Sequence, residues 1–485
     1  MHFKNHTIIA LLFGVMTAGC SKNSAPNEPD MRLYDPDGAV LYNYPEEADP
    51  SDAYAVAINE MPYFVFPVPQ TIQRPPPGFL NPFTPHIVNF DIAGKVMVEI
   101  TPKKTINAVK IRPESAGISC TLKGNTLKLF LEKPQFLSVE INNDIENPLL
   151  LFANEPETEI PDKDDPNVIF FEAGKIHERS VGALSNQTVY LAPGAIVYGA
   201  IKVGDRSNVR IMGRGILSGA KFPTEGTRPV EFEHVTNGTI EGITIVDCKG
   251  WSMPLVACNN ITVSGIKIVS NTGMEDGIDI VGSKNVTVDR CFIRTKDDCI
   301  ALKAGITYYD WRDSRFAVEN ILVKNCVIWN GKHGNGIEIG YELDADTVRN
   351  VIFENIDLIH TENPGLMDDE GSITIHNSGR AVIHDILYKN IRIEDPQRIL
   401  FHFAVLESVY SPASTMYGKI MDVRLEDITV TSSRGTLRSK IMGYSSTQNV
   451  QGIAFKNLTF NGDKVTTGDQ INLSTNAYVA NITFE

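Results

Sequence analysis

The sequence predicts an all-β protein in which a small antiparallel β-sandwich precedes a right-handed parallel β-helix. Two observations carry this prediction. Before residue 165, short runs of alternating apolar and polar residues are separated by Pro, Gly and Asn, as in antiparallel strands. After it, one apolar pattern headed by asparagine recurs at intervals of about 30 residues, a period typical of solenoids.

The N-terminus predicts a bacterial lipoprotein signal peptide over residues 1–20. Lys4 supplies a positive charge, residues 8–16 form an apolar run too short to span a bilayer, and Thr17-Ala-Gly-Cys20 resembles a lipoprotein cleavage box. We expect Cys20 to carry the lipid of an exported protein of the outer membrane or periplasm; an ordinary secretory signal is the alternative. Residues 21–44 are expected to form a polar tether.

A β-sandwich is expected over residues 45–160. Runs such as Lys95-Val-Met-Val-Glu-Ile100 alternate with the period of a half-buried strand. The acidic, Pro-containing segment 155–165 is expected to link this domain to the next.

The parallel β-helix is expected over residues 165–485. The pattern Asn-apolar-x-apolar-x-x-apolar-x-apolar begins most clearly at Asn260, Asn285, Asn320 and Asn350, in steps of 25, 35 and 30 residues. Two short strands per repeat and little helix favour a β-helix, whose coils bury apolar faces against one another. A β-propeller is the alternative, but its blades need four strands and about 40 residues each.

Composition argues against nucleic-acid binding and against a zinc site. The net charge of −15 argues against a nucleic-acid partner, because no basic stripe is present to displace counterions from phosphates. The six cysteines after Cys20 have no CxxC spacing, so we expect no zinc site and no cofactor, and most of these cysteines should fill core positions.

Three aspartates, Asp276, Asp297 and Asp298, are predicted to meet. Asp276 precedes the other two by 21 and 22 residues, which is one short coil of a β-helix. Residues one coil apart stack at about 4.8 Å, and the strand must bend or end for adjacent Asp297 and Asp298 both to reach a cleft. Clustered carboxylates share acid and base roles, as inverting glycosidases require. A calcium site or aspartates that cap turns are the alternatives.

Two further acidic positions are expected to have structural roles. Asp279 is expected to serve a turn or the outer face of the β-helix. The acidic run 368–370 is expected to be a solvated loop.

These aspartates also carry a resemblance. Asp276-Gly-Ile-Asp followed by Asp297-Asp-Cys-Ile-Ala-Leu-Lys303 resembles the motifs of glycoside hydrolase family 28, the polygalacturonases, over roughly residues 170–460. The resemblance implies a right-handed β-helix and hydrolysis with inversion. It implies that Asp297 is the general acid and that Asp276 and Asp298 activate the attacking water.

The chain departs from that family at two motifs. The Gly-His-Gly motif appears as Lys332-His-Gly-Asn-Gly336. The resemblance implies that His333 is the catalytic histidine of this motif, but alignment on the strand that follows leaves it one residue out of register. The Arg-Ile-Lys motif, which holds the substrate carboxylate, is absent, and Arg380, the nearest cation to the expected stretch, is a candidate for substrate binding. Because bidentate recognition by arginine is not readily replaced, a galacturonate substrate is in question.

Other segments are similar to glycoside hydrolase family 49, the dextranases and isopullulanases. They are Tyr190-Leu-Ala-Pro-Gly-Ala-Ile-Val-Tyr-Gly-Ala200, Gly213-Arg-Gly-Ile-Leu-Ser-Gly219 and the stretch 350–360. This resemblance implies the same fold, the same mechanism and a neutral glucan as substrate.

Residues near the aspartates are candidates for substrate binding. Lys303 is expected in the cleft, where it would tune the carboxylates, and Glu338 alternates with isoleucines, so its side chain should leave the apolar core. The remaining candidates are aromatic residues with apolar faces for sugar rings: Trp251, Trp311, Tyr308, Tyr309 and Tyr341.

The sequence therefore predicts an inverting hydrolase of a polysaccharide, with a pectic substrate or, alternatively, a neutral glucan. The same fold would also suit a polysaccharide lyase or a non-catalytic glycan-binding solenoid.

Overall fold

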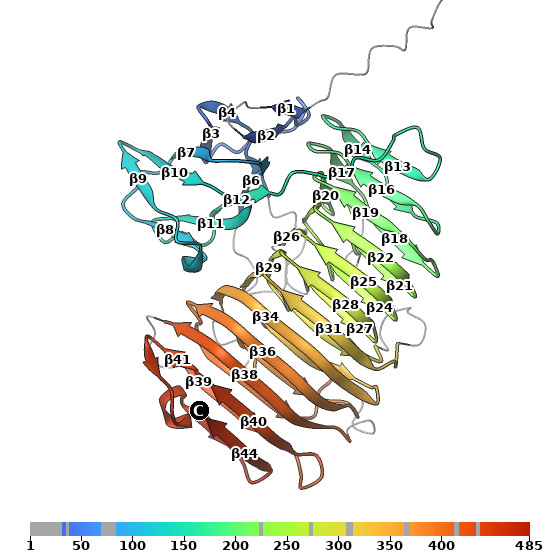
Figure 1. Cartoon of the computed structure of the whole chain (residues 1–485), viewed down its shortest axis with the longest axis vertical. Coiled ribbons are helices and arrows are strands. Elements are labelled where there is room, and N and C mark those ends of the chain that lie inside the picture. Colours follow the sequence, from blue (N-terminus) through green and yellow to red (C-terminus); the bar gives the residue numbers. More distant parts are fainter. Residues whose placement is uncertain are drawn as a thin grey trace, which may run out of the picture.

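The predicted fold class is confirmed: a small β-sandwich is followed by a right-handed parallel β-helix (Figure 1). The computed structural model describes residues 32–34, 38–68, 84–222, 227–270, 275–306, 314–362, 369–411, 417–432 and 437–485. Within these ranges the helical elements are the short 3-10 helices Glu114–Ala116 and Gly468–Ile471, and no helix is long and apolar enough to cross a membrane.

Two sheets form the sandwich. The first contains β1 (Arg32–Tyr34), β2 (Ala39–Tyr42), β5 (Phe66–Pro67), β6 (His86–Ile92), β8 (Val109–Arg112), β11 (Gln135–Ile141) and β12 (Leu149–Asn154). The second contains β3 (Tyr54–Ile58), β4 (Met61–Tyr63), β7 (Val96–Pro102), β9 (Cys120–Lys123) and β10 (Thr126–Leu131). Most pairs are antiparallel, but β12 and β6 are parallel.

The sandwich begins earlier than predicted. Strand β2 lies inside the expected tether, residues 21–44, and pairs with β6 so that Ala39 lies opposite Ile92. Ala39 and Leu41 are buried in the core of the sandwich. The apolar run Ala39-Val-Leu-Tyr42 provides the buried face that makes this segment a strand.

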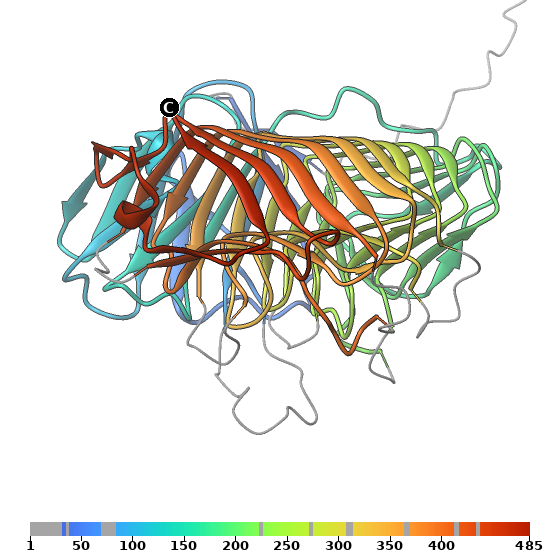
Figure 2. The ribbon, with the colours of Figure 1, turned by 90° about the horizontal axis from the view of Figure 1, so that it is seen from below.

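Three rows of parallel strands form the β-helix. The first row is β13 (Val168–Phe171), β16 (Thr188–Leu191), β19 (Arg210–Gly213), β22 (Thr236–Glu241), β25 (Asn259–Ser264), β28 (Lys284–Asp289), β31 (Val318–Lys324), β34 (Thr347–Thr361), β36 (Val382–Glu394), β38 (Lys419–Thr431), β40 (Val450–Lys456) and β44 (Val479–Phe484). The second is β14 (Ile176–Glu178), β17 (Ile196–Tyr198), β20 (Ile216–Ser218), β23 (Thr244–Val246), β26 (Lys267–Val269), β29 (Phe292–Thr295), β32 (Val327–Asn330), the later parts of β34, β36 and β38, and β41 (Thr459–Phe460), which pairs with β42 (Asp463–Lys464). The third is β15 (Val181–Gly182), β18 (Ile201–Gly204), β21 (Val230–Glu233), β24 (Met253–Val256), β27 (Ile278–Val281), β30 (Ile300–Ala304), β33 (Ile337–Leu343), β35 (Ile373–Asn377), β37 (Ile399–Val405), β39 (Arg438–Met442) and β43 (Leu473–Thr475). Figure 2 shows the successive coils stacked from green to red.

The described coils thus contain a third strand that the sequence pattern missed, since it predicted two per repeat. The recurring pattern covers the first two strands, for example β25 and β26, which are separated by a bend at Gly265 with φ of 60°. The third strand, such as β27, follows a connection of variable length and has no leading asparagine. The third row nevertheless positions the candidate site.

The asparagine that opens each repeat has a physical function in the stack. Asn285, Asn320 and Asn350 all have positive φ, near 55°, which asparagine tolerates better than most residues. The side-chain amide of Asn350 donates to Oδ1 of Asn320 at 2.6 Å, and that of Asn320 donates to Oδ1 of Asn285 at 2.8 Å. The repeat seen in the sequence is therefore a ladder of turn residues that bond from coil to coil.

Substitution of Asn320 should separate the two contributions of this ladder. Asn320→Ala loses both amide bonds and replaces asparagine, which tolerates the left-handed region, by alanine, which does so less well, so we expect the free energy of unfolding to fall by about 2 kcal/mol. Asn320→Gly keeps the backbone conformation at no steric cost and should lose only about 1 kcal/mol. Urea unfolding of both variants measures this difference, and an Asn320→Ala variant as stable as the parent would contradict it.

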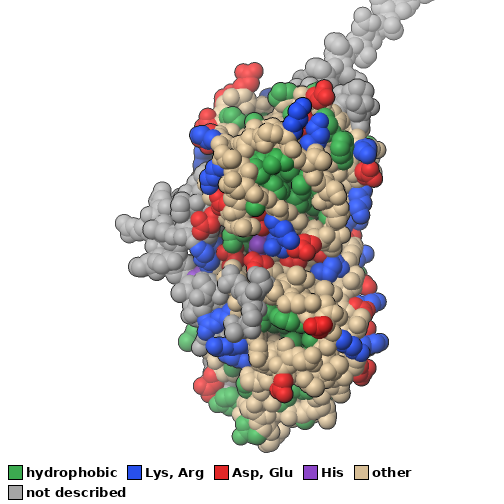
Figure 3. Space-filling model, turned by 90° about the vertical axis from the view of Figure 1, so that its left-hand side faces the viewer, with side chains coloured by type: hydrophobic (Ala, Val, Ile, Leu, Met, Phe, Trp, Pro, Cys, Tyr) green, Lys and Arg blue, Asp and Glu red, His purple; other side chains and the backbone are tan. Residues whose placement is uncertain are grey.

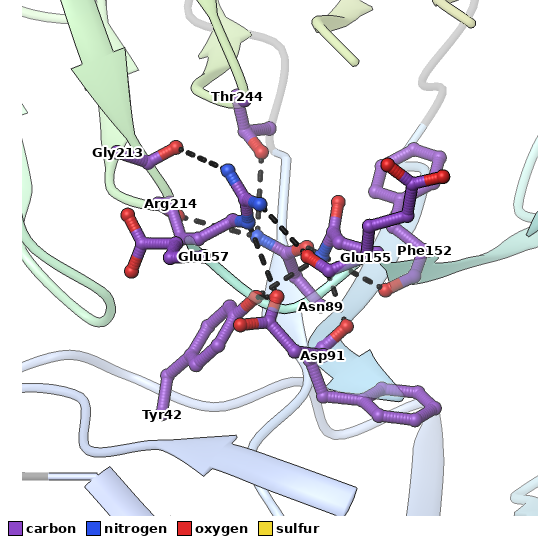
Figure 4. Close-up of polar contacts among 12 residues, drawn as sticks. Tyr42, Asn89, Asp91, Phe152, Glu155, Glu157, Gly213, Arg214 and Thr244 are labelled. Carbon is purple, nitrogen blue, oxygen red and sulfur yellow. Dashed lines mark hydrogen bonds and ion pairs between the residues drawn. The ribbon is translucent and has the colours of Figure 1, made fainter. Parts of the chain in front are cut away.

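The sandwich packs on the second row of β-helix strands. Phe152 of β12 contacts Phe292 of β29, with ring centroids 5.1 Å apart, within an apolar cluster that spans both domains. A polar network lies beside it: Arg214 donates through Nε to Asp91 at 3.1 Å and through a terminal nitrogen to the carbonyl of Glu155 at 2.8 Å (Figure 4). The apolar and polar contacts hold the two domains together on a side of the β-helix that the candidate site does not use.

Figure 3 shows the face on the left of Figure 1, where acidic and basic side chains are interspersed.

Candidate active site

A cleft of about 750 Å³ opens beside the third row of β-helix strands. Its described lining comes entirely from the β-helix: Trp251, Asp276, Asp297, Asp298, Lys303, His333, Gly334, Asn335, Tyr341, Glu342, Asp369, Glu370, Leu406, Glu407, Ser408, Val409 and Tyr410. Its volume falls in the range of small-molecule and substrate sites.

The structure brings the three predicted aspartates together in this cleft. Strands β27 and β30 pair with Ile278 opposite Ile300, which places Asp276 next to Asp298 on the neighbouring coil. The amide of Gly277 donates to the carbonyl of Asp298 at 2.8 Å. Because β29 ends at Thr295 and β30 begins at Ile300, the aspartate pair lies in the corner between strands, where both side chains reach the cleft.

Lys303 lies at the centre of the acidic cluster. Its Nζ is 2.6 Å from Oδ2 of Asp276, 3.2 Å from Oδ1 of Asp279 and 3.7 Å from Oδ2 of Asp298. Asp279 was expected at a turn or on the outer face; instead it lies fully buried in β27 as part of this cage. The positive charge at the centre of these carboxylates is thus supplied by an ammonium group.

Burial and Lys303 have opposite effects on the pKa values of the carboxyl groups in the cluster. Burial raises the pKa of Asp276 and of Asp298 well above the ordinary value, and the ammonium of Lys303 lowers both. Burial raises the pKa of Asp279 to about 6. Burial disfavours the charge on Lys303, but the carboxylates, first among them Asp276, hold its pKa well above the ordinary value. The cluster can therefore hold a proton near neutral pH and keep a carboxylate ionised beside it.

Asn335 and Gly334 fix the aspartate pair. The backbone amide and the side-chain amide of Asn335 both donate to Oδ1 of Asp298 at 2.8 Å. Gly334, with φ of 64°, lies so close that a Cβ there would be 2.4 Å from the amide nitrogen of Asp298 and 2.5 Å from Oδ1 of Asp297. Glycine is thus required at this position for both conformation and space.

Gly334→Ala should reduce kcat/KM by about 100-fold, because the added methyl must displace the aspartate pair and sub-ångström placement matters for catalysis. The matched control is Gly124→Ala, since Gly124 has a similar φ of 62° but no atom within 4 Å of an added Cβ. Steady-state kinetics on both variants tests the point. Equal activity of Gly334→Ala and Gly124→Ala would show that the close approach is unimportant.

His333 lines the cleft, as the resemblance implied for a catalytic residue, and its Nδ1 is 3.8 Å from Oε1 of Glu370. The acidic run 368–370 was expected to be a solvated loop. Asp368 lies outside the described residues, but Asp369 and Glu370 both line the cleft. Burial raises the pKa of Glu370. Nothing in the local sequence distinguishes this run from a surface loop; only the stacking of its coil brings it to the site.

Tyr341 also lines the cleft, and a buried polar chain supports it. Its hydroxyl donates to Oδ2 of Asp369 at 2.8 Å, and its ring stacks on His376 with centroids 4.4 Å apart. Nδ1 of His376 is 3.0 Å from both carboxylate oxygens of Glu338. Glu338 leaves the apolar core as expected, but it is fully buried and bonded to His376 and Thr374, so it lies behind the cleft lining.

Arg380 was expected to bind substrate, but the structure places it outside the cleft. Its Nε donates to Asp344 at 2.8 Å, and a terminal nitrogen pairs with Asp346. Of the aromatic candidates, Trp251 lines the cleft, and Trp311, Tyr308 and Tyr309 lie outside the described residues.

The fold and the cleft together define a parallel β-helix with an acidic cleft beside its third row of strands. Over 93% of this chain and 100% of the other, the structure is similar to Dex49A from Penicillium minioluteum, with a TM-score of 0.66 and 16% sequence identity, a likeness of fold. The family model for glycosyl hydrolases family 28 matches residues 220–483, which is more than half of the chain. The chain belongs to that family.

Curated relatives differ in the polysaccharide that they are named for. The chain is 24% identical over 253 residues to a polygalacturonase from Cryptomeria japonica, across 47% of this chain and 46% of that protein. It is 25% identical over 289 residues to an isopullulanase from Aspergillus niger, across 50% of this chain and 47% of that protein. The chain thus spans about half the length of these relatives.

Proposed function

We propose that this protein is an inverting glycoside hydrolase that cleaves glycosidic bonds within a polysaccharide. The observation that carries the proposal is the convergence of Asp276, Asp297 and Asp298 on one cleft, where Nζ of Lys303 contacts Asp276 and Asp298. Membership of glycosyl hydrolases family 28 supports it. The names of the relatives leave two substrate classes, pectic polysaccharides and neutral glucans.

In the proposed reaction, Asp297 donates its proton to the glycosidic oxygen as the bond between that oxygen and the anomeric carbon breaks. Asp297 is the most exposed of the three aspartates, so it is the one best placed to reach a leaving group. A water attacks the opposite face of the anomeric carbon and gives its proton to Asp276 or Asp298. The products are a free hydroxyl and a reducing sugar of inverted configuration, and Lys303 favours the ionised form of the two bases.

The first test is release of reducing ends from polygalacturonate, rhamnogalacturonan, dextran and pullulan by the purified protein. A hydrolase releases reducing sugar without absorbance at about 235 nm, whereas a lyase produces an unsaturated uronate that absorbs there. A glycan-binding solenoid releases no sugar, and its binding is the same in the parent and in Asp297→Asn. The lyase result and the result for a glycan-binding solenoid would each exclude the hydrolase.

We also propose that Cys20 carries a lipid that anchors the exported protein to a membrane. Lys4, the apolar run 8–16 and the box ending at Cys20 support this proposal. Radiolabelled palmitate should enter the parent protein and should not enter Cys20→Ser; equal labelling of the two would reject it.

A further inference from the structure

The candidate cleft has an unusual balance of charge. Lys303 and His333 are its only basic side chains among the described lining residues. Against them stand seven carboxylates: Asp276, Asp297, Asp298, Glu342, Asp369, Glu370 and Glu407. Even with protons retained on the buried members of the cluster, the described lining is an acidic surface.

The ammonium group of Lys303 already has partners. The side chain is 6% exposed, its Nζ contacts the three carboxylates of Asp276, Asp279 and Asp298, and Nζ lies 3.9 Å from the centroid of the Trp251 ring. A substrate carboxylate could reach this ammonium only by displacing one of the aspartates that the proposed reaction uses. His333 is in a similar position, because its ring faces the carboxylate of Glu370.

Among the described residues, Arg380 and Arg315 form their ion pairs with aspartates that do not line the cleft. Arg380 pairs with Asp344 and Asp346, and Nε of Arg315 pairs with Asp344 at 2.8 Å. Proteins recognise carboxylates through arginine or lysine, often through paired hydrogen bonds. A uronate placed in this cleft would meet like charge, which costs several kcal/mol when it is desolvated.

The same lining suits a sugar without charge. Trp251, Tyr341 and Tyr410 supply aromatic faces, and Leu406 and Val409 supply apolar surface for the C–H groups of a sugar ring. Carboxylates are strong acceptors for sugar hydroxyl groups. We infer that the substrate of this site is a polymer of neutral sugars rather than of uronates, an inference that rests on the proposed hydrolase function and selects between its two substrate classes.

The test compares substrates that differ only in charge. Polygalacturonate and its carboxyl-reduced form have the same linkage, and dextran, pullulan, rhamnogalacturonan and alginate extend the neutral and acidic sets. We expect the full-length protein to hydrolyse at least one neutral polymer with kcat/KM at least about 100-fold above that for any uronate polymer. Hydrolysis of a uronate polymer at an equal or higher kcat/KM would overturn the inference.

A binding measurement separates this inference from the hydrolase proposal. Asp297→Asn protein is titrated by calorimetry with neutral oligosaccharides from dextran and pullulan, with oligogalacturonates, and with carboxyl-reduced oligogalacturonates. Tighter binding of a neutral ligand than of the oligogalacturonates supports the inference, even if no polymer is hydrolysed and the hydrolase proposal fails. Tighter binding of the oligogalacturonates, or no binding of any neutral ligand at millimolar concentration, contradicts it.

Discussion

Asp297→Asn is expected to reduce hydrolysis of the natural polysaccharide by about 1,000-fold or more, since loss of a general acid typically costs two to four orders of magnitude. Asparagine has the same shape as aspartate and can keep a place beside the backbone amide of Asp298, to which Oδ1 of Asp297 is bonded at 3.0 Å. The fold should therefore be unchanged. The rate is measured by reducing-sugar release, with circular dichroism as a check of folding.

An activated substrate distinguishes the acid from the bases. An aryl glycoside with a good leaving group needs no proton, so Asp297→Asn should recover to within about tenfold of the parent on it. Asp276→Asn and Asp298→Asn should remain inactive on both substrates, because water activation is still required. Asp463→Asn, in exposed strand β42, is the matched control and should have parental activity. If Asp298→Asn is the variant that the aryl glycoside rescues, the acid and base assignments are reversed.

Lys303→Met should lower kcat/KM at neutral pH by about 100-fold or more, the size of effect seen when one electrostatic contact is removed from an active site. Lys303 lowers the pKa of Asp276 and of Asp298, so its removal raises both values further. The bases must be ionised to accept a proton, and the acid limb of the pH profile of kcat/KM should therefore move to higher pH. The measurement is a full pH profile of parent and variant.

Stability provides the second readout for Lys303→Met. Removal of one partner from a buried ionic cluster costs about 3 kcal/mol or more of unfolding free energy. Without Lys303 the folded variant keeps these protons to higher pH than the folded parent does, so the difference in stability between the two should grow as pH rises through the folded-state pKa values of the parent's carboxylates. Lys267→Met is the matched control, because Lys267 is a fully buried lysine at the domain interface. It should change stability without moving the acid limb, and a shifted limb in this control would undermine the assignment.

The sequence contained enough information to predict the coils and to place the aspartates. Asparagines in the left-handed region mark the first strand of successive coils, so the repeat was visible and the 22-residue step from Asp276 to Asp298 could be recognised as one coil. The turn asparagines recur at the same place in each repeat, so a local pattern of residues is enough to reveal them. The five cysteines from Cys248 onward are buried, as expected of small core residues.

The missed features depend on contacts between coils. The third strands follow connections of irregular length, so their register was not visible in the sequence. The sequence analysis therefore did not connect Asp279 with Lys303, although their strands β27 and β30 are neighbours. In that register Asp279 lies opposite Ala301 and Val281 opposite Lys303, a pairing that brings the buried acid and base together. Asp369 and Glu370 reach the cleft for the same reason, through the coil that precedes β35.

The most direct test of the central claim is the stereochemistry of the first product. The polysaccharide that the protein hydrolyses is incubated with enzyme in an NMR tube, and the anomeric proton signals are followed before mutarotation equilibrates them. We expect the new reducing end to appear first with the configuration opposite to that of the cleaved bond. A first product of retained configuration would show that a covalent intermediate forms and that the three aspartates do not act as a single-displacement centre.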